Sequence, residues 1–352
     1  MNISPALSTP ATAFAPVTLT PQTPPLTCAR QLILERVQEM AKFEAGTRRG
    51  EDLEALHDMR VWSRRLREAL EIFAFCFSQK IYNKLYARVR QVTKALGRAR
   101  EADVAVEFFA KLHAAAEDLT ERFALEDVLM RLTREQQRRR AKMQDKLDQK
   151  ARASTLPEEM AAAFQRLSLQ PASRRGPRTA LRLARTLLAQ RLQTVFAARH
   201  AITGEDDSTG LHNLRIAVKK LRYALEAMEF AAGEAAAANL KFFKKLQSVL
   251  GDLHDRDVFI ATIKQRYEAL QNLAYSATLR AGHEKIFAQL AQERHEFYQR
   301  YVPLFAEAKL AEWRKLIVPA LPAAKKPARA KKISGNGVVS ESQPVQKNAM
   351  SS

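Results

Sequence analysis

The feature that most constrains the fold is a segment that occurs twice in the chain. LHNLRIAVKKLRYALEAMEF at residues 211–230 repeats the pattern of LHDMRVWSRRLREALEIF at residues 56–73. The basic residues that coincide are His57, Arg60, Arg64, Arg65 and Arg67 in the first copy and His212, Arg215, Lys219, Lys220 and Arg222 in the second. Helical residues advance by about 100° each, so the histidine and the positions three, seven and ten later fall within roughly 80° of arc. Each copy therefore predicts a helix with one cationic face.

The apolar residues of each copy predict where that cationic face lies. They form a stripe of the kind that faces a helical core: Leu56, Met59, Leu66, Leu70 and Phe73 in the first copy, and Leu211, Leu214, Val218, Leu221, Leu225 and Met228 in the second. The cationic arc borders this stripe, whereas a solvated face would lie opposite it and mix both signs of charge. Only Glu71 and Glu226, at matching positions, fall on the basic side. We therefore expect the basic faces at a junction between helices.

Composition predicts an all-α fold. Gly and Pro are sparse between about residues 30 and 316, strong helix formers dominate there, and no alternating strand pattern is present. The duplicated unit predicts two related halves that share one pseudo-symmetric core.

A second matching pair of segments follows the cationic helices. LGRAREADV at residues 96–104 matches LGDLHDRDV at residues 250–258, which pairs Gly97 with Gly251, Arg100 with His254, and Asp103 with Asp257. A glycine after a helical run is typical of a helix end, and an aspartate shortly afterwards is typical of the next helix start. We expect the aspartates to be caps or helix-end ion-pair partners. The alternative is that they orient basic ligand-binding residues.

The two ends of the chain differ from the rest in composition. Residues 1–27 are rich in Pro, Thr and Ala, which predicts a disordered segment. After residue 319 the helical pattern is lost and KKPARAKK at residues 325–332 begins a basic tail, which is also predicted to be disordered and could add to polyanion binding. The clearest interior break lies at residues 168–177.

The charge balance predicts the class of ligand. The 352 residues include 58 Lys and Arg against 38 Asp and Glu, a formal net charge of +20. A polyanion is therefore the expected partner: nucleic acid, an anionic membrane surface or a phosphate polymer. Cys28 and Cys76 have no metal-ligand spacing, which predicts reduced thiols in a cytoplasmic protein. No apolar run approaches the ~20 residues of a membrane span, and the N-terminus does not resemble a secretory signal.

The two His-x-x-Arg segments, each followed by bases and then by an LGxxxxxDV segment, resemble the CHAD family, the conserved histidine α-helical domain. The resemblance covers roughly residues 28–318. It implies two four-helix bundles related by pseudo-twofold symmetry, with a first repeat at 28–167, a linker at 168–177 and a second repeat at 178–318. It also implies that a basic groove between the bundles binds inorganic polyphosphate. Members are often joined to a triphosphate tunnel enzyme domain, whose Glu-x-Glu-x-Lys strand signature is not found here, so no phosphohydrolase activity is expected.

The resemblance also implies which residues face the ligand. They are His57, Arg60, Arg64 and Arg67 in the first repeat and His212, Arg215, Lys219 and Arg222 in the second, with Arg36 and Arg191 as matching candidates on the preceding helices. Lys94, Lys244 and Lys245 are weaker candidates because their helix phase is less defined. Arg100 stands where the second repeat has His254, so the two halves of the site would differ there.

Three classes of function are compatible with these patterns. The first is non-catalytic polyphosphate binding in the cytoplasm, or at polyphosphate granules there, with arginine forks and lysine charges on the phosphates. The second is nonspecific nucleic-acid binding through phosphates, against which aromatic residues make up only 7% of the chain. The third is a metal-dependent phosphohydrolase, suggested by His57-Asp58, His254-Asp255 and Asp257. A cationic neighbourhood repels divalent metals, so we expect no metal, cofactor or catalysis.

Overall fold

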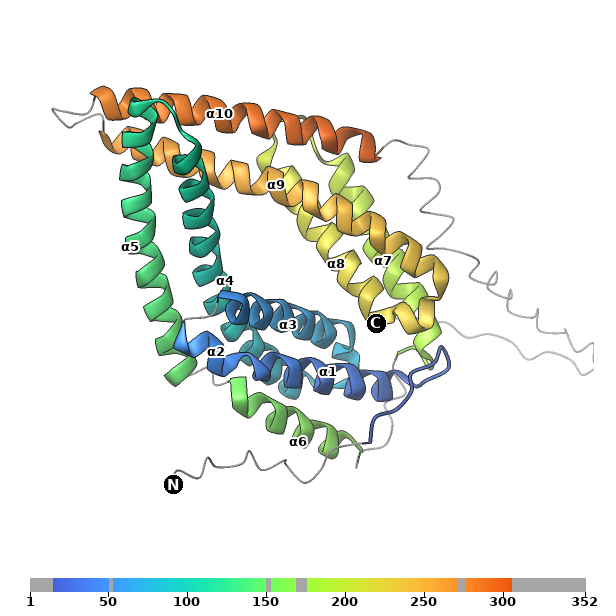
Figure 1. Cartoon of the computed structure of the whole chain (residues 1–352). Helices are drawn as coiled ribbons and strands as arrows, with labels where there is room; N and C mark the ends of the chain where they lie inside the picture. The colour runs from blue at the N-terminus through green and yellow to red at the C-terminus, as the bar shows by residue number, and fades with distance from the viewer. Residues whose placement is uncertain (1–14, 51–52, 150–152, 169–175, 271–276, 306–352) are drawn as a thin grey trace, which may run out of the picture. The chain divides into compact units, whose positions relative to one another are not determined.

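The computed structural model describes residues 15–50, 53–149, 153–168, 176–270 and 277–305. In these ranges all regular secondary structure is helical and no strand occurs, which confirms the all-α prediction. The helices, drawn in Figure 1, are α1 (Pro25–Lys42), α2 (Glu44–Arg49), α3 (Leu53–Ile72), α4 (Gln79–Ala115), α5 (Leu119–Gln149), α6 (Leu156–Ser168), α7 (Ala180–His200), α8 (Ser208–Ala232), α9 (Glu234–Leu270) and α10 (Ala277–Tyr301). Short 3-10 helices cover Ala74–Cys76, Ala153–Thr155 and Val302–Phe305. The predicted basic tail and most of the predicted linker lie outside the described residues.

The two cationic segments form α3 and α8, as predicted, and these two helices contact each other. Helix α1 packs on α3, and α7 packs on α8. The helices that follow are α4 and α9, each 37 residues long. Helix α4 pairs with α5, and α9 pairs with α10 (Figure 1).

The predicted helix ends at Gly97 and Gly251 are wrong, because α4 and α9 run straight through both glycines. A glycine inside a helix costs only about 1 kcal/mol relative to alanine. Leu96 and Leu250, each next to one of the glycines, are buried in the core. Tertiary packing of the flanking residues thus outweighs the local preference.

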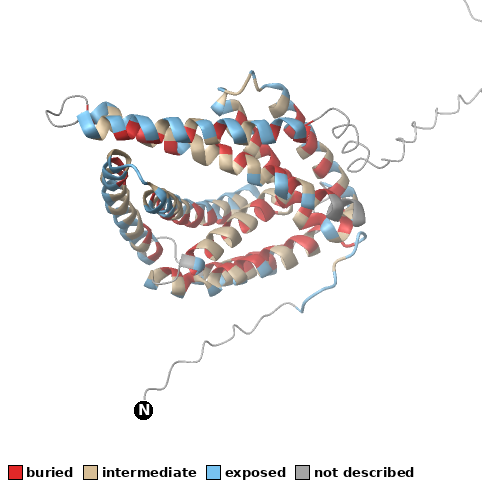
Figure 2. Ribbon diagram, turned by 45° about the horizontal axis from the view of Figure 1, so that its top comes forward, coloured by how far each residue is buried: buried red, intermediate tan, exposed pale blue. Residues whose placement is uncertain are grey.

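Two hydrophobic clusters form the core of the described residues. The larger contains buried residues of α1, α3, α6, α7 and α8 together with the first halves of α4 and α9. The smaller contains Phe109 of α4, Leu125 of α5, Phe259 of α9 and Ile286 of α10. Figure 2 shows the buried residues as stripes along the helices, beside exposed stripes. Both clusters draw on both repeats, which fits a shared core, and the assignment of one four-helix bundle to each repeat stays a prediction.

The predicted disordered segment at residues 1–27 is too long. Helix α1 already begins at Pro25, because proline fits the first helical turn, where no backbone N–H is needed. The backbone carbonyls of Pro21 and Thr23 accept hydrogen bonds from the N–H groups of Leu181 and Ala180, at 2.8 and 2.9 Å. The approach to α1 is thereby tied to the start of α7. Residues 1–14 lie outside the described part of the chain.

None of the described helices combines the length and the apolar character that a helix needs to cross a membrane.

Candidate functional site

The contact between α3 and α8 is made by reciprocal ion pairs. Arg65 Nε on α3 lies 3.6 Å from Glu226 Oε2 on α8, and Lys220 Nζ on α8 lies 3.0 Å from Glu71 Oε2 on α3. Arg65 and Lys220 occupy matching positions of the repeat, and so do the two glutamates. The two contacts are therefore the same interaction made in opposite directions, which is compatible with the predicted pseudo-twofold symmetry.

Arg36 and Arg191, predicted to face the ligand, are engaged within the protein. Arg191 Nη2 lies 2.7 Å from Oε1 of Glu68, a residue of α3 that is 4% exposed. Arg36 is also buried, and its Nη1 donates to the backbone carbonyl of Arg65 at 3.2 Å. Burial lowers the pKa of Arg36 to about 10 and raises the pKa of Glu68. Both arginines thus hold α1 and α7 against α3, and their contact with ligand stays a prediction.

Arg222 also has partners of its own. Its Nε donates to Gln247 Oε1 on α9 at 2.7 Å, it pairs with Glu226, and its guanidinium lies 4.4 Å from the centre of the Tyr223 ring. A ligand would have to compete with these contacts to bind it.

Five further predicted residues have no such partners in the part of the chain that the structure describes, and we refer to them as the cation cluster. Among the described residues, none of the five side chains has an acidic group within 4.0 Å of its charged nitrogens, and all five are partly buried. The buried Nε of Arg60 has no hydrogen-bond partner in the described chain. The cation cluster consists of Arg60, Arg64 and Arg67 on α3 and Arg215 and Lys219 on α8.

The members of the cation cluster act on one another electrostatically. Burial, and then the charges of Arg64, Arg215, Arg67 and Arg60, lower the pKa of Lys219 to about 7. Burial and the charge of Arg64 lower the pKa of Arg60 to about 10. Positive charges that are close together and partly withdrawn from water disfavour their own charged forms. The cation cluster is therefore a site where an added anion would gain more than at an ordinary solvated surface.

The two predicted histidines have different surroundings. His57 is partly buried on α3. His212 on α8 meets His254 on α9, with 3.2 Å between their Nδ1 atoms and 4.5 Å between the ring centres. Burial lowers the pKa of both rings, that of His254 to about 4. Because the first repeat has Arg100 in place of His254, it cannot make this histidine pair.

The prediction that Asp103 and Asp257 cap helices is wrong, because both lie inside long helices. Asp103 Oδ1 accepts from Arg140 Nε at 3.0 Å, which joins α4 to α5. Asp257 Oδ1 accepts from Arg294 Nε at 2.6 Å, which joins α9 to α10. Each arginine follows its aspartate by 37 residues, and this shared spacing is a signal in the sequence from which the two pairs could have been predicted. The aspartates are thus ion-pair partners, although not at helix ends, and the pairs join neighbouring helices. The alternative role, in which they orient ligand-binding bases, stays a prediction.

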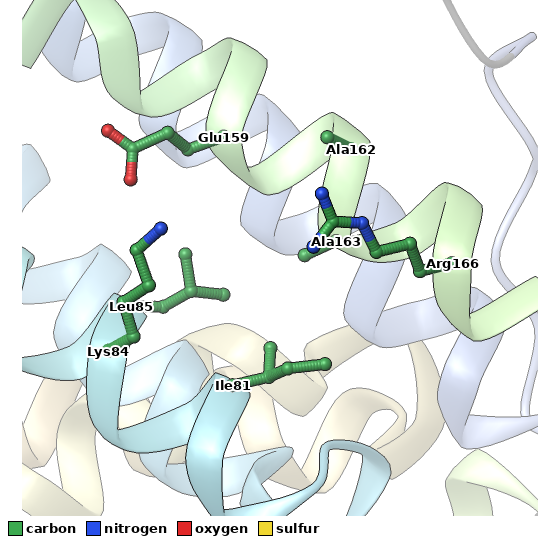
Figure 3. Close-up of a pocket in the computed structure, with 7 residues that line it drawn as sticks. All are labelled: Ile81, Lys84, Leu85, Glu159, Ala162, Ala163 and Arg166. Carbon is green, nitrogen blue, oxygen red and sulfur yellow. The ribbon is translucent and has the colours of Figure 1, made fainter.

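Two pockets in the described chain lie apart from the cation cluster. One, of about 170 Å³, opens between α4 and α6 (Figure 3). It is lined by Ile81, Lys84 and Leu85 of α4 and by Glu159, Ala162, Ala163 and Arg166 of α6. The other, of about 470 Å³, lies between α9 and α10. Neither is lined by a member of the cation cluster, so the candidate site is identified by its charge. In the described ranges, no three or more His, Cys, Asp or Glu side chains gather in a way that could hold a metal ion.

The three weaker candidates for ligand binding are not members of the cation cluster. Lys94, Lys244 and Lys245 are exposed on α4 and α9, in the manner of ordinary surface lysines.

Comparison with known proteins identifies the fold and the family. A solved structure, the CHAD domain from the plant Ricinus communis, is similar with a TM-score of 0.58 and 19% identity, over 87% of this chain and 97% of that one. PptA from Streptomyces chartreusis is similar with a TM-score of 0.59 and 16% identity, over 80% of this chain and 99% of that one. No match was found among the curated proteins. The sequence pattern of the CHAD domain matches residues 31–264, and the chain therefore belongs to the CHAD domain family.

Proposed function

We propose that this protein binds inorganic polyphosphate at the cation cluster and does not act on it as an enzyme. The observation that supports this most is the presence of five partly buried cations on two adjacent helices without acidic partners in the described chain. Phosphate oxygens would supply the missing hydrogen-bond acceptors and the missing negative charge. The ligand would be met in the cytoplasm, with polyphosphate granules as the natural place.

The aromatic residues beside the cation cluster favour a phosphate polymer over nucleic acid. Arg65 lies 4.8 Å from the centre of the Trp62 ring, and Arg222 lies 4.4 Å from that of Tyr223. Single-stranded nucleic acids are usually bound by stacking their bases on free aromatic faces. Arginines of the protein already occupy a face of each of these two rings, so the rings offer poor stacking surfaces for nucleic-acid bases.

The absence of catalysis is part of the proposal. Burial raises the pKa of the Cys28 thiol to about 11 and that of Cys76 to about 12, so neither supplies a thiolate nucleophile at neutral pH. A divalent metal that activates water would meet the field of the cation cluster, which opposes its binding.

Competition between polymers tests the choice of ligand. In isothermal titration, we expect long-chain polyphosphate to bind more tightly than triphosphate and orthophosphate, because neighbouring phosphates of one chain engage several cations together. Duplex DNA at the same phosphate concentration should leave most of the polyphosphate bound. Full displacement by DNA would favour the nucleic-acid function, and release of orthophosphate with added Mg²⁺ or Mn²⁺ would contradict the absence of catalysis.

A further inference from the structure

We infer that His212 and His254 form a proton-binding pair within the polyphosphate site, so that the half contributed by the second repeat gains positive charge as the ligand binds. The inference rests on the proposed function. It adds two things to it: His254 as a residue of the site, and a dependence of affinity on pH.

The geometry of the pair allows one extra proton. The two Nδ1 atoms lie 3.2 Å apart, so one must donate and the other must accept. Two neutral rings satisfy this when one carries its proton on Nδ1. Adding one proton keeps a donor facing an acceptor and makes the hydrogen bond charge-assisted. A second proton would place two donors face to face and break it.

Burial, and then the charges around the pair, keep it neutral while the site is empty. From α8, Arg215 and Lys219 disfavour protonation of both rings. From α9, Asp257 favours protonation of His212, but it also accepts a hydrogen bond from Arg294 of α10. Burial is the largest effect on both histidines and lowers the pKa of His254 to about 4.

Groups of α3 and α9 act on the cations that surround the pair. Arg64 and Arg60 of α3 act on Lys219 and add to the positive field. Asp255 of α9 acts on Arg215, and burial raises the pKa of its carboxyl. For both histidines, the charges that act are therefore positive in majority among the described residues.

A polyanion reverses this field. Phosphates that neutralise Arg215 and Lys219 remove the repulsion and add negative charge, which raises the pKa of the pair. Between the pKa of the empty site and that of the occupied site, binding takes up a proton. Affinity must then rise as the pH falls through that interval. In the first repeat, Arg100 stands at the position of His254 and stays charged at all these pH values. At this position, only the second repeat therefore has a charge that changes with pH.

The matching position of the first repeat supplies the test. We would titrate long-chain polyphosphate into the wild-type protein and the His254→Arg variant between pH 5.5 and 7.5, in buffers of different ionisation enthalpy that report proton uptake directly. For the wild type we expect affinity to rise with falling pH, by up to about tenfold per pH unit for one proton. His254→Arg should bind at least as tightly at pH 7.5 and should show a flatter slope and less proton uptake.

Two controls keep the result specific to the pair. The terminal phosphates of the polymer titrate near pH 6, and Lys219, whose pKa is lowered to about 7, also gains a proton when an anion binds beside it. Every variant keeps both groups, so the difference between a variant and the wild type reports the histidine pair. His200→Arg adds a charge at an exposed position and should keep the wild-type slope. His254→Gln serves if the arginine variant does not fold, and it too should flatten the slope.

The outcomes separate this inference from the proposed function. Equal slopes and equal proton uptake in the wild type and His254→Arg would overturn the inference while leaving polyphosphate binding in place. A wild-type protein that binds no polyphosphate at any pH would overturn both.

Discussion

Lys219 shows how a residue of the proposed site can lower the stability of the fold. Its partly buried ammonium has no acidic partner in the described chain, and burial and four arginines lower its pKa from 10.5 to about 7. The unfolded chain holds this proton up to much higher pH. The folded state is therefore destabilised by Lys219 at neutral pH, and this loss fades as the pH rises towards the unfolded pKa.

Replacing this lysine should separate stability from binding. We expect Lys219→Met to raise the free energy of unfolding by roughly 1 to 3 kcal/mol at pH 7, because an unfavourable partly buried charge is removed. The same variant should bind polyphosphate more weakly. Urea denaturation between pH 7 and pH 10 measures the first effect, and the gain in stability should shrink as the pH rises.

The matched control is Lys142→Met on the exposed face of α5, which should change stability by less than about 0.5 kcal/mol. A Lys219→Met variant that is less stable than the wild type at pH 7 would contradict the electrostatic strain assigned to the cation cluster.

The candidate site could be predicted only in part, because the repeat shows which residues are basic but not which residues of other helices they contact. The repeat identified every member of the cation cluster, because histidine and base positions coincide in the two copies. It did not show that Arg191 and Arg222 are engaged by Glu68 and Gln247, since these partners lie on other helices. The His212–His254 contact was hidden for the same reason, although the difference between His254 and Arg100 was visible.

Among the helices, two glycines differ in the space around them. Gly251 lies inside α9, and a Cβ added there would meet nothing within 4 Å. Gly282 lies inside α10, where a Cβ would come 2.3 Å from the backbone oxygen of Thr120 and 2.6 Å from the Cβ of Ala124 on α5. Of these two glycines, only the second is required by the approach of another helix.

Alanine at these two positions should have effects of opposite sign. Gly251→Ala should stabilise the protein by about 0.5 to 1 kcal/mol, through the higher helix propensity of alanine. Gly282→Ala should destabilise it by about 1 to 3 kcal/mol, because α5 and α10 must move apart. Urea denaturation of both variants tests this, and equal effects of the two would contradict the close packing of α10 on α5.

Helix positions were more predictable than helix ends. The period of apolar residues placed α3 and α8 correctly, because their stripes face the larger hydrophobic cluster. Gly97, Gly251, Asp103 and Asp257 were wrongly predicted to mark helix ends, because local preferences of about 1 kcal/mol yield to packing and to ion pairs between helices.

For the molecule as a whole, the duplication links fold and charge. The two repeats share both hydrophobic clusters of the described chain, and the reciprocal pairs Arg65–Glu226 and Lys220–Glu71 join their cationic helices. The net charge of +20 draws polyanions to any part of the surface. A specific polyanion site therefore differs from general electrostatic attraction in that its affinity depends on the positions of particular cations.

The most direct test compares two variants that each lose four basic side chains. The first variant has glutamine in place of four members of the cation cluster, Arg60, Arg64, Arg215 and Lys219. The second has glutamine in place of four exposed bases elsewhere, Lys80, Arg122, Arg134 and Arg182. Titration with long-chain polyphosphate should show a loss of at least about 100-fold for the first variant, because several charge-assisted hydrogen bonds disappear together, and of no more than about threefold for the second. Circular dichroism should show unchanged helix content in both. Equal losses of affinity would contradict a specific site at the cation cluster, because general charge would then be sufficient to explain binding.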